Sequence, residues 1–246
     1  MPIDRDKGLP IAETFHSIQG EGTWVGTPMH FIRLAGCPVG KKASAELRSS
    51  GDFNVLAPEW QRFGYDNPNV SACKTWDGRA FVCDTDFSCH TYKTVDELIG
   101  ETWEKHICLT GGEPLIHQKS LIEQGFFQQA FAKRIQVHIE TSGTVELDHR
   151  LIHDNRLWIA VAPKWNFLSS MIRLASEIKF LVDENFSSNK VREILAWAHP
   201  NCEIWLSPIN SEKEVNQENV KIIREIQEHY PTWRLSAQWH KLLGLR

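Results

Sequence analysis

The chain has 246 residues, with 27 Lys and Arg against 31 Asp and Glu and a formal net charge of −4. A chain of this length can bury a full core without disulfides or metal staples, so we take residues 1–246 as one domain. The weak, mixed charge offers no broad basic surface for nucleic acid or an anionic membrane. No stretch of about 18 apolar residues occurs, and the start MPIDRDKGLP has no secretory-type apolar segment, so we expect a cytoplasmic protein with no membrane partner.

Short apolar runs alternate with helical patterns along most of the chain. The first elements expected are a buried strand at 29–36, an irregular polar insertion over 38–82, and a helix that follows an N-cap at Thr94. Strand and helix patterns then follow in turn: strand 106–112, helix 120–134, strands 135–143, 157–164 and 177–182, helix 189–199, strand 202–208, helix 218–230 and strand 233–238.

Strands that are apolar along their whole length and alternate with helices indicate parallel β/α units covered by those helices. The count of six or seven such strands falls short of a closed eight-fold barrel. The sequence therefore predicts an α/β fold built as a partial (β/α)6-type, TIM-like barrel. In such folds the chemistry gathers at the C-terminal ends of the strands.

Four of the six cysteines, at positions 37, 73, 83 and 89, precede residue 90. In a reducing compartment, clustered thiols indicate metal ligands or catalytic groups rather than disulfides. Tetrahedral zinc needs four ligands, commonly from paired C-x-x-C units, and this chain has no such pair. An iron–sulfur cluster held by three cysteines instead leaves one iron open. Spacing alone leaves a cluster, zinc and unrelated buried thiols as open alternatives for Cys37, Cys73 and Cys83, with Cys89, Cys108 and Cys202 to spare.

Several short motifs lie in the first part of the chain or at the ends of the expected strands. In order these are SIQGEG (17–22), RLAGC (33–37), CDTDF (83–87), TGGEP (110–114), IETSGT (139–144), APK (162–164), EIKFLV (177–182) and RLSAQWHKLLGLR (234–246). Taken together they resemble the 7-carboxy-7-deazaguanine synthase family of radical S-adenosylmethionine enzymes. The resemblance runs from about residue 12 to residue 246 and leaves only the interval between Cys37 and Cys83 unmatched.

The resemblance implies a radical S-adenosylmethionine core domain that carries the cluster-binding insertion 38–82. It implies a 4Fe-4S cluster on three cysteines whose open iron chelates S-adenosylmethionine, and reductive cleavage of that cofactor to a 5'-deoxyadenosyl radical. The implied substrate is 6-carboxy-5,6,7,8-tetrahydropterin, which loses ammonia in a Mg²⁺-assisted ring contraction to 7-carboxy-7-deazaguanine, in 7-deazapurine (queuosine-type) biosynthesis. Implied partners are a flavodoxin- or ferredoxin-like electron donor and a second copy in a homodimer.

The cysteine pattern departs from that of the family. Cys37 matches the first ligand and Cys83 the last, yet the residue three before Cys83 is Ala80 where relatives carry a cysteine. The middle ligand therefore comes from elsewhere. We predict Cys73, since the loop before the CDT motif supplies the middle ligand in relatives, and keep Cys89 as its rival.

The resemblance also assigns the remaining site residues. Thr85 corresponds to the Mg²⁺ ligand, which suits a hard cation that prefers oxygen donors. The predicted S-adenosylmethionine contacts are Gly112, Glu113, Ala162, Pro163, Lys164, Ser207, Pro208, Ile209 and Asn210. The predicted substrate contacts are Ile18, Gln19, Gly20, Arg33, Thr110, His240 and Arg246.

Some of these assignments have alternatives. Glu113 beside Pro114 could simply be a helix-start carboxylate. Ala162 stands where relatives often carry Ser, so a hydroxyl contact is missing there. Glu140 and Ser142 are expected to frame the ribose or the pterin.

Two other functions compete with the synthase. A radical activase that makes a glycyl radical on a partner protein would share the cluster and the GGEP motif, but it does not need SIQGEG or the His240 tail. A zinc-stabilised, non-redox binding module would use the same cysteines for structure alone.

Overall fold

A nine-stranded sheet forms the framework of the computed structural model, which describes residues 8–42, 71–83, 85–152, 154–210 and 214–245. The strand order is β12-β11-β10-β9-β8-β7-β2-β1-β6. Neighbours from β2 to β12 pair in parallel, and β1 (Leu9–Ile18) pairs antiparallel with β2 and with β6 (Thr91–Lys93). The parallel strands are β2 (Pro28–Leu34), β7 (His106–Gly111), β8 (Gln136–Thr141), β9 (Leu157–Val161), β10 (Glu177–Val182), β11 (Glu203–Pro208) and β12 (Arg234–Leu235).

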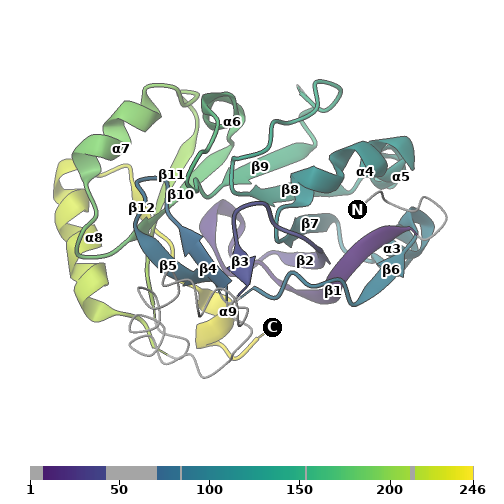
Figure 1. Cartoon of the computed structure of the whole chain (residues 1–246), viewed down its shortest axis with the longest axis horizontal. Coiled ribbons are helices and arrows are strands. Elements are labelled where there is room, and N and C mark those ends of the chain that lie inside the picture. The colour runs from purple at the N-terminus through teal and green to yellow at the C-terminus, as the bar shows by residue number, and fades with distance from the viewer. Residues whose placement is uncertain (1–7, 43–70, 84, 153, 211–213, 246) are drawn as a thin grey trace.

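Helices connect these strands and lie around the periphery of the sheet, with α7 and α8 on one side and α3, α4 and α5 on the other (Figure 1). The sheet is open and mostly parallel, which confirms the predicted partial-barrel class. The α-helices are α3 (Val95–Glu101), α4 (Gln118–Glu123), α5 (Phe126–Ala132), α6 (Ser169–Leu174), α7 (Ser188–Leu195), α8 (Gln217–His229) and α9 (Trp239–Leu242), and short 3₁₀ turns are η2 (Gly22–Trp24) and η3 (Pro114–His117).

The main core lies between the sheet and these helices. Alternate strand residues such as Ile107, Val137 and Phe180 are fully buried and belong to one apolar cluster with helix residues such as Phe126. Because side chains alternate between the two faces of a strand, the residues between them point to the inner face of the curved sheet. That inner face carries polar side chains, including Thr110, and becomes the site described below.

Several elements differ from the sequence prediction, and β6, α6 and α9 were not predicted. Helix 120–134 is interrupted, because Gly125 adopts φ +78° in the left-handed region and separates α4 from α5. Strand β1 was not anticipated, since its sequence LPIAETFHSI carries polar residues on both faces. The last strand, β12, is only two residues long.

The insertion predicted to have little regular structure contains a small antiparallel sheet in the order β3-β4-β5. Its strands are β3 (Lys41–Lys42), β4 (Ser71–Lys74) and β5 (Ala80–Cys83). Regular pairing arises here because the TWDG turn brings β4 and β5 together, with Gly78 at φ +88°. Residues 43–70 of the insertion lie outside the described residues. Across the described helices, none has the length and apolar character needed to cross a membrane.

Candidate active site

Three cysteines from separate elements line one cavity of about 160 Å³. The cavity lies at the C-terminal ends of strands β7 to β9, where a parallel β/α fold places its chemistry. The lining residues are Cys37, Val39, Gly40, Cys73, Cys83, Thr85, Phe87, Gly111, Gly112, Glu140, Thr141, Ser142, Ala160, Ala162, Lys164 and Lys179. Sequence motifs up to about 140 residues apart therefore meet at one mouth of the sheet.

The hairpin β4–β5 places two of these thiols on one face. Cys73 pairs directly with Phe81, and Cys83 lies two residues further along β5, so Cys73 and Cys83 are diagonal neighbours. Such neighbours are roughly 7–8 Å apart. At this spacing both side chains can reach one shared inorganic group.

The third thiol, Cys37, follows β2 and the turn at Gly36. Its sulfur accepts a hydrogen bond from the Gly40 amide at 3.2 Å. Burial raises the pKa of Cys73 to about 11, the Lys164 ammonium opposes that rise, and the nearby Cys83 and Cys37 add to it. Three neighbouring thiols at this site suit a cationic group that binds sulfur. Such a group binds the thiolate form, so its binding releases the thiol protons.

The other cysteines do not line this cavity. Cys89 is exposed and its sulfur lies 3.4 Å from the carbonyl oxygen of Thr91. The geometry therefore favours Cys73 over Cys89 as the middle ligand, which remains a prediction. Among the described residues, no group of three or more Cys, His, Asp or Glu side chains is arranged to hold a single metal ion.

The TGGEP loop crosses the cavity beside Cys37. A Cβ atom on Gly112 would lie 2.0 Å from the carbonyl oxygen of Gly36, so only glycine fits. The amides of Gly112 and Glu113 donate to the carbonyls of Leu34 and Gly36 at 3.2 and 2.9 Å. This backbone pairing extends the edge of β2 and fixes the loop against the first cysteine.

Glu113 is fully buried and does not line the cavity. One carboxylate oxygen accepts from the Leu115 amide and the Thr141 hydroxyl, at 3.2 and 2.8 Å. The other accepts from the amide and hydroxyl of Ser142, at 2.8 and 2.5 Å. The structure thus shows Glu113 as a helix-start carboxylate, which was the alternative to the predicted cofactor contact. Glu113 ties the TGGEP loop to the end of β8.

Two more predicted cofactor segments follow β9 and β11. Ala162 and Lys164 line the cavity, and the Lys164 ammonium lies 3.1 Å from the Ala162 carbonyl oxygen; Pro163 between them is buried. Ser207, Pro208 and Ile209 are buried at the end of β11, and Asn210 accepts a hydrogen bond from the Asn216 amide at 3.0 Å. None of these four lines the cavity, but Ile209 packs against Cys73 and Phe81. Within the described structure the buried Ser207 hydroxyl has no hydrogen-bond partner.

A polar network extends from the cavity along the inner face of the sheet. Glu140 accepts from Gln19 Nε2 at 3.1 Å and from the Thr110 hydroxyl at 3.0 Å, and it lies 3.4 Å from Lys179 Nζ. Lys179 also lies 3.3 Å from the Glu21 carboxylate. Two predicted substrate contacts, Gln19 and Thr110, are therefore joined through a carboxylate.

Electrostatics keep this network charged. Burial alone would raise the pKa of Glu140, but Lys179 and the donated hydrogen bonds outweigh it and lower the pKa to about 2. Burial alone would likewise lower the pKa of Lys179, yet Glu140, Glu21 and Glu177 raise it above its ordinary value. Lys179 and Glu21 were not singled out from the sequence. A lysine in the mostly apolar strand EIKFLV was the signal that could have found the first of them.

The predicted tail residues close over the loop after β1. The amide of Trp239 donates to the Gly20 carbonyl at 3.0 Å, and Gln238 donates to Glu21 at 3.0 Å. His240 packs so closely on Gly20 that a Cβ atom there would lie 2.1 Å from His240 Nδ1. The structure therefore brings His240 beside Gly20, as the two substrate predictions require. Arg246 lies outside the described residues.

The two remaining predicted substrate contacts, Arg33 and Ile18, lie on β2 and β1. Arg33 pairs in register with Thr110 across β2 and β7, and its Nε is 3.3 Å from the Glu13 carboxylate. Its guanidinium lies 5.4 Å above the ring of Phe15. The Arg33 guanidinium is therefore already paired with one carboxylate on this face. Ile18, at the end of β1, is half-buried.

Aromatic rings and two histidines lie on the inner face near the start of the strands. Trp24 makes an edge contact with His138 at 5.1 Å and with Trp158 at 5.5 Å, and His106 Nδ1 lies 3.0 Å from His138 Nε2. Burial, and the neighbouring His106, lower the pKa of His138 to about 3, so the pair is neutral at physiological pH. This layer is two to four residues N-terminal to Thr110 and Glu140 and forms the floor beneath the polar network.

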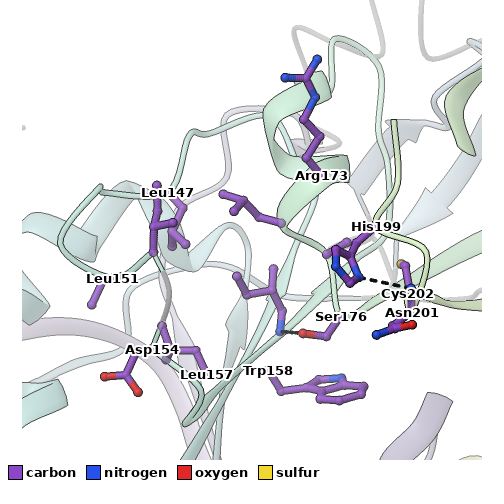
Figure 2. A pocket seen from close by; sticks show the side chains of 14 residues that line it. Leu147, Leu151, Asp154, Leu157, Trp158, Arg173, Ser176, His199, Asn201 and Cys202 are labelled. Carbon is purple, nitrogen blue, oxygen red and sulfur yellow. Dashed lines mark hydrogen bonds between the residues drawn. The ribbon is translucent and has the colours of Figure 1, made fainter. Parts of the chain in front are cut away.

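A second cavity, of about 440 Å³, lies at the opposite ends of the strands (Figure 2). It opens at the starts of β9, β10 and β11, among residues that include Leu157, Ser176 and Cys202. It is larger than the cysteine cavity, but no predicted site residue lines it. Because the functional groups of a parallel sheet gather at its C-terminal end, the smaller cavity is the candidate active site.

An open, mostly parallel β/α sheet with three thiols at its C-terminal mouth defines the class of radical S-adenosylmethionine enzymes. No protein-family model matches the chain. The chain is 32% identical over 251 residues to 7-carboxy-7-deazaguanine synthase from Synechocystis sp., covering 96% of this chain and 93% of that one. It is 31% identical over 251 residues to the synthase of the same name from Buchnera aphidicola, covering 96% and 99%. The chain therefore belongs to the 7-carboxy-7-deazaguanine synthase family.

The fold comparison agrees with that assignment. The crystal structure of QueE from Escherichia coli superposes with a TM-score of 0.61 at 26% identity, covering 94% of each chain. The chain is thus an enzyme of 7-carboxy-7-deazaguanine synthesis that uses an iron–sulfur cluster and S-adenosylmethionine. Family membership sets aside the glycyl-radical activase.

Proposed function

We propose that this enzyme converts 6-carboxy-5,6,7,8-tetrahydropterin to 7-carboxy-7-deazaguanine with loss of ammonia, as a step of 7-deazapurine (queuosine-type) biosynthesis. The observation that carries the proposal is the shared cavity. Three cysteine thiols, the TGGEP loop and the Glu140 network all border one space at the mouth of the sheet. A cofactor at the thiols and a substrate on the inner face would be in contact there.

Cys37, Cys73 and Cys83 would hold the cluster. When bound with S-adenosylmethionine, the cluster supplies the electron that generates a 5'-deoxyadenosyl radical. The residues proposed to bind the cofactor border the thiols on two sides, at Gly112 and at 162–164. The unpartnered Ser207 hydroxyl supports a polar ligand near the end of β11, since a buried hydroxyl without a partner is costly.

The chain's own residues would bind and orient the pterin. A carboxylate held charged by Lys179 can accept from the amino and ring N–H groups of a pterin, and Gln19 and Thr110 fix the position of that carboxylate. Arg33 has a planar guanidinium suited to the substrate carboxylate. His240 and Gly20 would close the pocket over the substrate, and the aromatic floor would exclude water from below.

Further parts of the proposal extend to groups outside this chain. Thr85, which lines the cavity, would give its hydroxyl oxygen to Mg²⁺ beside the substrate. The electron donor would be a flavodoxin- or ferredoxin-like protein, and the enzyme would act in the cytoplasm as a homodimer. Residues 1–246 would form one radical S-adenosylmethionine domain, with 38–82 as its cluster-binding insertion.

The test is direct turnover. Anaerobically reconstituted protein, incubated with S-adenosylmethionine, reductant, Mg²⁺ and carboxytetrahydropterin, is expected to yield 7-carboxy-7-deazaguanine and 5'-deoxyadenosine by mass spectrometry. Cleavage of S-adenosylmethionine with no deazaguanine would contradict the substrate. Removal of residues 245–246 should raise the substrate KM more than it disturbs folding, and unchanged kinetics would remove the proposed role of the tail.

A further inference from the structure

The turn of the cysteine hairpin carries a nearly buried arginine, Arg79, to which the proposed function gives no role. We infer that Arg79, together with Asp77 and Asp183, is a latch that positions the β4–β5 hairpin so that Cys73 and Cys83 face the cavity. This inference rests on the proposed function, because it concerns the cluster ligands. In this chain a hairpin supplies two of the proposed ligands, whereas a compact motif supplies them in its family. The latch would position that hairpin.

The hairpin turn first orients the arginine. The Thr75 amide donates to the Arg79 carbonyl at 2.9 Å and the Gly78 amide to the Thr75 carbonyl at 3.0 Å. Within this turn Arg79 Nε lies 3.0 and 2.9 Å from the two carboxylate oxygens of Asp77. The Thr75 hydroxyl donates to Asp77 at 2.5 Å. The guanidinium is thus held in one orientation before it contacts the rest of the protein.

The same guanidinium then joins the hairpin to the C-terminal end of β10. Its Nη1 donates to the Asp183 carboxylate, its Nη2 donates to the Leu181 carbonyl at 3.0 Å, and its carbon lies 5.6 Å above the ring of Phe186. The side chains are 12% exposed for Arg79, 6% for Asp77 and 16% for Asp183. A planar, multiply bonded contact in a nearly dry site fixes direction as well as distance.

Other contacts also attach the hairpin to the rest of the protein, among them a backbone bridge between Thr75 and Lys164. The Trp165 amide donates to the Lys74 carbonyl at 3.2 Å, the Lys164 ammonium lies 5.2 Å over the Phe81 ring, and Phe81 packs on Ile209. Removal of the latch should therefore leave the hairpin attached but free to shift. A shift would expose Cys73, which is now only 7% exposed. Arg79 is in this sense a positioning residue that acts through the two thiols.

The experiment compares Arg79→Met with wild type in the metal-free full chain. Iodoacetamide labelling of each cysteine is followed by peptide mass spectrometry, and Cys73 is expected to react at least about tenfold faster in the variant. Exposed Cys89 and fully buried Cys108 serve as internal references that should keep their rates. Arg79→Lys, which keeps the charge but loses the fork, should give an intermediate rate.

A matched control is present in the chain. Arg150, like Arg79, pairs with the aspartate two residues before it: its Nε and Nη2 lie 2.9 and 2.7 Å from the Asp148 carboxylate. Unlike Arg79, the Arg150 side chain is 44% exposed and contacts no cysteine. Arg150→Met should leave every labelling rate unchanged. After reconstitution, Arg79→Met should also hold less iron per chain and lose iron to a chelator several-fold faster than Arg150→Met.

The outcomes separate the latch from the function. Wild-type labelling of Cys73 in Arg79→Met, with wild-type iron retention, would overturn the latch. Equal acceleration of Cys108 would also overturn it, because that result reports general unfolding rather than a hairpin shift. Should Arg79→Met not fold, the isosteric Asp183→Asn takes its place with the same expectations. A wild-type chain that binds no iron would refute the proposed function, while the labelling result would still decide whether the latch exists.

Discussion

Replacement of Lys179 by methionine tests whether the inner network depends on one buried cation. Lys179 lies 3.3 and 3.4 Å from Glu21 and Glu140, and its side chain is 9% exposed. The lowering of the Glu140 pKa from 4.5 to about 2 corresponds to roughly 3 kcal/mol of stability at neutral pH. Glu140 retains some solvent contact, so we expect Lys179→Met to cost roughly 2–3 kcal/mol. For a chain of this size that loss lowers Tm by about 5–10 °C.

The pH dependence gives the sharper test. In wild type the Glu140 contribution is present above the unfolded pKa of 4.5 and is lost as the pH falls towards about 2. In the variant, burial without Lys179 should raise the Glu140 pKa, so the variant recovers stability as the pH falls. The difference in unfolding free energy, measured by urea titration of the metal-free protein, should therefore shrink between pH 7 and pH 4. A constant difference would refute the reasoning. The exposed Lys221, 2.7 Å from Glu218, supplies the control Lys221→Met, which should change little.

Two further substitutions test the cluster ligands and the tail. Cys73→Ala should lower iron per chain after reconstitution, whereas Cys89→Ala should not; full loading without Cys73 would show that its cavity position is not a ligand position. Gly20→Ala would force a methyl group to 2.1 Å from His240 Nδ1, so the substrate KM should rise several-fold. Gly100→Ala, which has open space around the added Cβ atom, is the control and should leave the KM unchanged. An unchanged KM in Gly20→Ala would contradict the prediction.

The arrangement of the parallel strands was predictable because helices cover their outer face. Strands such as 106–111 and 177–182 are apolar on that face and short, so their type and order follow from the sequence. Strand β1 was missed because it alternates poorly and pairs antiparallel near the sheet edge. The β4–β5 hairpin was missed because its strands are short and show little periodicity, although the TWDG turn between them is a local signal.

The candidate site was predictable where a motif lies at the end of a strand. The thiols at Cys37, Cys73 and Cys83 were found by residue type, and the structure brings them to one cavity. Lys179 and Glu21 were missed because they pair with each other across more than 100 positions of sequence, and no local pattern shows that contact. The motif assigned Glu113 to the cofactor. Its burial, and the four hydrogen bonds that its carboxylate accepts, are visible only in the three-dimensional structure.

The contact between the loop after β1 and the segment around α9 has a consequence for folding. The Gly22 amide donates to the Ser236 hydroxyl at 3.1 Å across 214 positions of sequence, and Gln238 reaches Glu21 across 217. Contacts of such high sequence separation carry a large loop-closure entropy and form late. They are also the first to open in native-state fluctuations when few apolar contacts support them. The proposed pterin side of the enzyme should thus exchange its amide hydrogens, and melt, before the thiol side does.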